Sequence, residues 1–162
     1  MDIKQLNKIS IDRMKKLAPE LYIDTIDVSR PFFLLSSLFY KKESEFLSED
    51  YSLTQTELDI LASLFFSGSD DFCLTPTELK ELLRFTSGGI AKVLKKLESE
   101  KYITRIDNQE DKRSKFVQLT EQGKTTVKKA LKDIIEFEAK YFSKLDLDEK
   151  ENLKNLLFKL LS

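Results

Sequence analysis

The sequence has 162 residues, of which 41% are hydrophobic and 34% charged, and its net charge is −1. This length suits one ordinary domain, or a small domain with association helices, and the near-neutral charge excludes a generic nucleic-acid coat. The chain has no histidine and a single cysteine, Cys73, so it lacks the commonest general base and cannot form an internal disulfide framework.

The composition also argues against membrane and enzyme classes. No apolar run approaches the length of a membrane helix, and residues 1–17 mix charges throughout, so we expect a cytoplasmic protein with no membrane partner. Gly-rich phosphate loops and Cys or His clusters for zinc are missing from the sequence. We therefore predict no catalytic residues, no cofactor and no metal site.

Residues 1–50 are predicted to be N-terminal helices that serve dimerisation. An imperfect helical period over residues 1–18, ended by Pro19, indicates one helix or two short ones. This segment is either an arm that adds to a dimer interface or a partly ordered tail. A stronger period from Ile26 to Leu47 tolerates Pro31 in its first turn, and its apolar surface is broad enough to need cover from more than one side.

Residues 51–120 form the expected second domain, which mixes helices and strands. Thr54 and Glu57 match a capping box, in which each residue satisfies an amide left free at a helix start. Gly68 and its polar neighbours close that helix. Residues 72–74 are then expected to form a short extended segment that pairs with later strands.

Two further helices are predicted next. Thr75-Pro76-Thr77-Glu78 places an N-cap hydroxyl, a proline and a glutamate where a helix start uses them, so a short helix begins at Thr75. Thr86 or Ser87 is expected to cap the second helix. The inward face of this second helix is predicted to consist of Ile90, Val93, Leu94 and Leu97. Its outward face is predicted to consist of Gly88, Lys92, Lys95 and Ser99, with Lys96 on the flank.

Gly88 and Gly89 stand in the first turn of that second helix, where glycine lowers helix stability. Two interpretations remain open. The helix end comes close to another backbone or to a phosphate, or the helix simply begins with a loose turn.

A polar hairpin follows. The alternating patterns of residues 102–106 and 115–119 predict two strands, and the polar segment 107–114 between them is too long for a two-residue turn and should project as a wing. Residues 75–119 contain ten Lys or Arg against seven Asp or Glu, which indicates a local basic site. A lysine face beside a basic wing suits DNA, because a helix can enter the major groove while an arginine probes the narrower minor groove.

Residues 121–162 are predicted to be C-terminal dimerisation helices. Thr120 is expected to cap a long helix that ends near Leu145, and Asp148 with Glu151 to cap the last helix. Both ends of the chain thus offer apolar helices that a small domain cannot cover. Pairing with a second copy would cover them, and would bring two recognition helices to half-sites about one duplex turn apart.

Several short motifs occur together in this part of the chain. They are Thr75-Pro76-Thr77-Glu78-Leu79, the Ser-Gly-Gly helix start, Leu97-Glu98, Ile103-Thr104-Arg105, Asp111-Lys112-Arg113-Ser114 and Leu119-Thr120-Glu121-Gln122-Gly123. From about Val28 to its C-terminus the chain thereby resembles the MarR family of bacterial transcriptional regulators. The resemblance implies a mainly α winged helix-turn-helix fold, with an α+β reading head between the N- and C-terminal dimerisation helices. It further implies that Arg113 enters the minor groove, that Asp111 orients it, and that residues 87–96 lie along the major groove.

We therefore predict a homodimeric transcriptional regulator, a repressor, that binds a pseudo-palindromic operator in double-stranded DNA. The residues predicted to contact DNA are Thr86, Ser87, Gly88, Gly89, Lys92, Lys95, Lys96, Asp111, Lys112, Arg113 and Lys115. A competing hypothesis is a winged helix that binds proteins and not DNA.

Two further features carry their own alternatives. Cys73 is either a small buried residue or an oxidant-sensing thiol that switches the regulator. Six aromatic residues either belong to the core or line a pocket for a small-molecule effector. They are Phe32, Phe33, Phe39, Tyr40, Phe65 and Phe66.

Overall fold

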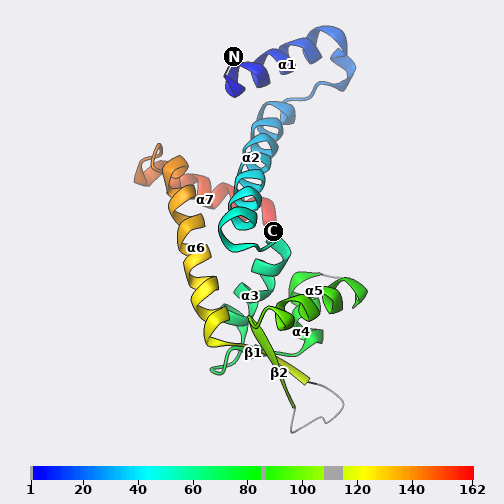
Figure 1. Ribbon diagram of the computed structural model, residues 1–162. Coiled ribbons are helices and arrows are strands. Elements are labelled where there is room, and N and C mark those ends of the chain that lie inside the picture. Colours follow the sequence, from blue (N-terminus) through cyan, green and yellow to red (C-terminus); the bar gives the residue numbers. More distant parts are fainter. Residues whose placement is uncertain (1, 85–86, 108–114) are drawn as a thin grey trace. The chain divides into compact units, whose positions relative to one another are not determined.

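The computed structural model describes residues 2–84, 87–107 and 115–162, and Figure 1 shows its elements. Their bounds are α1 (Ile3–Leu17), η1 (Pro19–Leu21), α2 (Thr25–Tyr51), α3 (Gln55–Ser67), β1 (Cys73–Leu74), α4 (Pro76–Leu83), α5 (Ser87–Ser99), β2 (Ile103–Asp107), β3 (Lys115–Leu119), α6 (Glu121–Phe142) and α7 (Leu147–Leu161). The predicted fold class, mainly helical with a small sheet, is confirmed. The chain divides within α2 into two compact units, Met1–Glu45 and Phe46–Ser162.

The first unit contains α1, the 3-10 turn η1 and most of α2. Residues 3–17 form a single helix, so of the two predicted possibilities, one helix or two short ones, the first is confirmed. The hydroxyl of Tyr22 donates a 2.6 Å hydrogen bond to Asp27, and Lys15 makes a 3.5 Å ion pair with the same carboxylate. Pro31 lies in the second turn of α2 and not in the first, because the helix begins at Thr25. The proline ring removes one backbone hydrogen bond there, with the Asp27 carbonyl as the group left without that donor.

Helix starts in the second unit largely follow the predicted capping chemistry. Thr54 and Glu57 form the capping box of α3, and Thr75 and Glu78 form that of α4. The prediction for α7 was two residues off. Its N-cap is Asp146 and the reciprocal partner is Glu149, at 2.8 Å and 3.0 Å, whereas Asp148 lies inside the helix. The same Asp-x-x-Glu spacing occurs twice in succession, and spacing alone does not distinguish the two.

The sheet has the strand order β1-β3-β2, with both pairs antiparallel. Cys73 lies opposite Gln118, so the short segment before α4 pairs with a wing strand as predicted. In the hairpin, Ile103 lies opposite Leu119 and Asp107 opposite Lys115. The strand pattern predicted for the hairpin is therefore confirmed.

The core of the second unit is built around α3, which packs against α4, α5, α6 and the sheet. Leu61 and Leu64 of α3 are fully buried, as are Leu97 of α5 and Val127 of α6. Ile90 and Leu94 are also buried, and Val93 packs against the core, so the predicted inward face of α5 is confirmed. This packing fixes which side of α5 faces solvent. Among the described residues, no helix is both long and apolar enough to cross a membrane.

Candidate nucleic-acid interface

The helix pair α4 and α5 presents the candidate recognition surface. Leu79 of α4 and Leu97 of α5 are completely buried and anchor the pair to the core. The C-cap residue of α4, Arg84, adopts the left-handed conformation with φ 54°, which ends the helix abruptly. Ser87 is the first residue of α5, while the predicted cap Thr86 lies outside the described residues.

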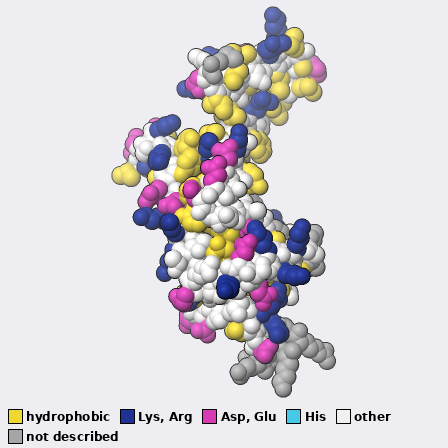
Figure 2. Space-filling view, in the orientation of Figure 1, with side chains coloured by type: hydrophobic (Ala, Val, Ile, Leu, Met, Phe, Trp, Pro, Cys, Tyr) yellow, Lys and Arg dark blue, Asp and Glu magenta, His cyan; other side chains and the backbone are white. Residues whose placement is uncertain are grey.

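The exposed side of α5 is basic. Gly88, Lys92, Lys95 and Ser99 are all solvent-exposed, as the helical period predicts, and Gly89 and Lys96 are exposed as well. Within the described part of the chain, neither Lys92 nor Lys95 has a carboxylate in ion-pair contact. Figure 2 shows lysine and arginine side chains gathered over this region of the molecule. As far as the described residues go, these two cations are therefore available for an external anion.

Gly88 has open space where a side chain would project, since an added Cβ would meet no atom within 4 Å. Its φ is not positive, so neither packing nor backbone conformation within this chain requires glycine there. A requirement for glycine at this position would therefore come from a partner that approaches the helix.

Lys96 differs from its neighbours because it is held by an ion pair that the sequence did not reveal. Its Nζ lies 2.7 Å from Oε1 and 3.0 Å from Oε2 of Glu57, whose exposed fraction is only 3%. The same carboxylate accepts a hydrogen bond from the Thr54 amide at 2.8 Å. Glu57 therefore caps α3 and, through its ion pair with Lys96, also joins α5 to α3.

The charges of this pair shift both pKa values. Burial would raise the pKa of Glu57, but hydrogen bonds from Lys96 and the Thr54 amide outweigh it, so the pKa lies below its ordinary value. The hydrogen bond to Glu57 raises the pKa of Lys96, although partial burial opposes this. Both groups are thus held in their charged forms at neutral pH.

The wing strands project from the same unit. Lys115 is exposed at the start of β3 and makes a 3.4 Å ion pair with Asp107, its partner across the hairpin. Asp111, Lys112 and Arg113 lie outside the described residues. The described strands support the hairpin, and the roles predicted for those three residues stay predictions.

The base of the wing is joined to the start of α6. Thr120 donates its hydroxyl hydrogen bond to the Lys101 carbonyl at 2.6 Å and accepts one from the Gly123 amide at 3.0 Å. The Thr120 amide also donates to the Tyr102 carbonyl at 3.1 Å. A Cβ at Gly123 would overlap that carbonyl, so α6 can lie this close to the wing only with glycine there.

Cys73 is half-buried on β1, with its Sγ 3.1 Å from the Ser69 hydroxyl. The predicted aromatic residues do not gather in one described pocket. Phe32, Phe33, Phe39 and Tyr40 belong to the first unit. In the second unit, Phe65 and Phe66 line a groove of about 460 Å³ between α3 and α6, and Phe66 is 71% exposed. No cluster of three or more potential metal ligands occurs among the residues described.

Comparisons with known proteins agree on one group. A family model described as transcriptional regulator SarA/Rot matches residues 33–130. SarZ, an HTH-type transcriptional regulator of Staphylococcus aureus, is 32% identical over 134 residues, which cover 79% of this chain and 84% of that protein. Wild-type MarR from E. coli, in its apo form, superimposes with a TM-score of 0.68 at 25% identity, over 83% of this chain and 96% of that chain.

A mutant MarR from E. coli complexed with operator DNA shares the fold, with a TM-score of 0.67 and 24% identity over 92% of this chain and 98% of that chain. The predicted MarR-like winged helix-turn-helix is therefore confirmed. The matched proteins are regulators of transcription, in agreement with the prediction that the chain is not an enzyme.

Proposed function

The chain belongs to the SarA/Rot family of transcriptional regulators, and from this premise we propose that it is a repressor that binds a pseudo-palindromic operator as a homodimer. The observation that carries the proposal is the outward face of α5, where Lys92 and Lys95 have no carboxylate partner among the residues described. The structure of mutant MarR complexed with operator DNA gives a DNA-bound example of the same fold.

The proposed footprint combines α5 with the wing. Residues 87–95 would lie along the major groove, with Lys92 and Lys95 on base edges or phosphates. Thr86 and Gly89 would add backbone contacts at the helix start. Arg113 would enter the minor groove, oriented by Asp111, and Lys112 and Lys115 would contact neighbouring phosphates. Lys96 belongs to the edge of this footprint, because Glu57 already holds its ammonium group.

The homodimer is supported by apolar side chains that the monomer leaves exposed. In the first unit, Val28 and Phe33 of α2 are largely exposed. In the second unit, Ile135 of α6 and Phe158 of α7 are equally open to solvent. Exposed apolar surface on helices at both ends of the chain fits association with a second copy.

A small-molecule effector completes the proposal. The apolar lining of the groove between α3 and α6 is formed by Phe65, Phe66, Leu131 and Ile135. Its charged lining residues are Lys128, Lys132 and Glu136. A ligand in this groove would contact both the helix that supports α5 and the helix joined to the wing. Its binding would therefore alter the spacing of the two recognition helices in the proposed homodimer.

The DNA-binding proposal predicts tight and salt-dependent binding that depends on Arg113. We expect fluorescence anisotropy on duplexes from the upstream region of its own gene to show affinity falling steeply as salt rises, because lysines and arginines release counterions from DNA. Arg113→Ala should weaken binding by about 1–3 kcal/mol per protomer.

The outcome also separates this proposal from its competitor. A folded dimer that binds no duplex at physiological salt, with or without Arg113, would favour a winged helix that contacts proteins. Binding that is unchanged in Arg113→Ala would remove the wing arginine from the interface and leave α5 as the main contact.

The role of Gly88 yields a second prediction. Gly88→Ala should leave the fold intact and raise its stability by up to about 1 kcal/mol, because alanine favours the helix and its Cβ has open space. If the first turn of α5 approaches a phosphate closely, the same change should weaken DNA binding. Thermal unfolding and anisotropy on one protein preparation measure both effects, and undiminished affinity would indicate that the glycine only loosens the helix start.

A further inference from the structure

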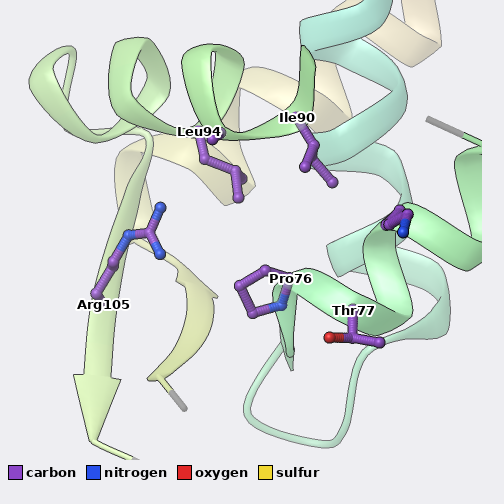
Figure 3. Close-up of a pocket in the computed structure, with 7 residues that line it drawn as sticks. Pro76, Thr77, Ile90, Leu94 and Arg105 are labelled. Carbon is purple, nitrogen blue, oxygen red and sulfur yellow. The ribbon is translucent and has the colours of Figure 1, made fainter. Parts of the chain in front are cut away.

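A cleft with basic side chains in its lining opens beside α5, between α4 and β2. It has a volume of about 270 Å³, and the apolar part of its lining is formed by Pro76, Ile90, Ala91 and Leu94. Its polar groups come from Thr77 and Lys80 of α4 and from Arg105 of β2. Figure 3 shows Arg105 and Pro76 on opposite sides of this opening, with Leu94 and Ile90 above it. Among the residues that the structure describes, no carboxylate lines the cleft.

Arg105 is positioned to offer its guanidinium to an anion in the cleft. Its Nε donates a 3.4 Å hydrogen bond to Glu98, and its side chain is 28% exposed. The two terminal nitrogens have no acceptor among the residues described. Glu98 thus holds the side chain in place, and within the described part of the chain no acceptor occupies the fork of the guanidinium, which is the group that suits a phosphate.

Lys80 of α4 supplies the second cation in the lining of the cleft. It is exposed on α4 and makes no ion pair within the described part of the chain. Two cations from different elements, α4 and β2, therefore line a cleft in which the described residues place no carboxylate. An oxyanion is the chemical class that such a site would bind.

The position of the cleft relative to α5 identifies the source of that oxyanion. Ala91 lines the cleft. Successive residues of an α-helix are about 100° apart around its axis, so Ala91 lies to one side of the outward-facing Lys92. The flank on the other side carries Lys96, which is occupied by Glu57. When a helix lies in the major groove, phosphate backbones pass along both of its flanks.

We propose that this cleft binds a backbone phosphate of the DNA through Lys80 and Arg105, on the Ala91 side of α5. The inference rests on the proposed DNA-binding function and extends its footprint from α5 and the wing to α4 and β2. A phosphate contact positions the protein without reading sequence. Removing this contact should therefore weaken binding to specific DNA and to random DNA by the same factor.

The test uses the full chain with Lys80→Gln, Arg105→Gln and the double variant. Lys95→Ala serves as the reference for the α5 face, and Lys8→Gln, an exposed lysine of α1, as the matched control. Anisotropy is measured from about 50 to 200 mM salt on the best-bound upstream duplex and on a random duplex. Melting temperatures show whether each variant is folded. If Arg105→Gln unfolds, Lys80→Gln alone tests the phosphate site, because Lys80 lies on an exposed helix face.

Each single substitution should weaken binding roughly tenfold per protomer and lower the salt slope by about one per protomer, alike on both duplexes. Lys8→Gln should change neither quantity. Wild-type behaviour of both cleft variants, beside a loss in Lys95→Ala, would overturn the phosphate site and leave the proposed function standing. If the cleft variants weaken binding to the upstream duplex but not to the random duplex, the phosphate site would also be overturned, because such a difference indicates a contact with bases. If the wild type binds no duplex, both proposals fail.

Discussion

Gly123→Ala is expected to lower the free energy of unfolding by about 2–4 kcal/mol. The new Cβ would overlap the Tyr102 carbonyl oxygen and approach Cδ2 of Leu119 to 3.0 Å. A backbone carbonyl cannot move aside as a flexible side chain can, so the start of α6 must shift away from the wing. That shift would strain the hydrogen bonds that Thr120 makes to residues 101 and 102.

Urea unfolding at one fixed protein concentration measures this loss, because the stability of the proposed homodimer would depend on protein concentration. Gly88→Ala is the matched control, since it makes the same chemical change at a helix start with open space around it. The two substitutions should therefore change stability in opposite directions. Equal effects would show that α6 can move from the wing at little cost.

Lys95→Ala and Lys96→Ala are expected to damage different properties although the two lysines are adjacent on one helix. Lys96→Ala should lower stability by about 1–2 kcal/mol, because it leaves the Glu57 carboxylate buried without its cation. The loss is smaller than for a fully buried pair since the Lys96 side chain is 43% exposed. Lys95→Ala should leave stability nearly unchanged and lower the salt slope of DNA binding by about one per protomer.

Urea unfolding and salt-dependent anisotropy on both variants distinguish the two roles. Both changes replace lysine by alanine within the same helix, so differences in helix propensity are small. A Lys96→Ala protein of normal stability, with the reduced salt slope expected of Lys95→Ala, would contradict the structural role of Lys96.

The same ion pair gives stability a defined pH dependence. Because the pKa of Glu57 is lower in the folded protein than in the unfolded chain, its full contribution is present above about pH 4.3. Below that pH the unfolded chain takes up the proton first, and the contribution declines until the folded carboxylate is protonated as well. The stability difference between wild type and Lys96→Ala should therefore narrow as the pH falls below about 4.3, and a constant difference would contradict this account.

Sequence patterns predicted most of the elements because their causes are local. The boxes at Thr54 and Thr75 each involve residues three apart, and the inward face of α5 follows from helical spacing alone. The alternating strands of the hairpin are equally local. The start of α7 was misplaced because two equivalent boxes occur in succession, and only the packed helix shows which one is used.

The sequence by itself thus determined the order of the elements, the exposed lysines of α5 and the likeness to MarR-type regulators. Tertiary structure decided what each of these residues does. Glu57 was predicted as a cap, but its ion pair joins residues 39 positions apart. Likewise, Gly123 is required because a carbonyl from the turn before β2 occupies the space of its side chain. Such roles depend on which distant groups the fold brings into contact, and helical or strand periodicity carries no information about those contacts.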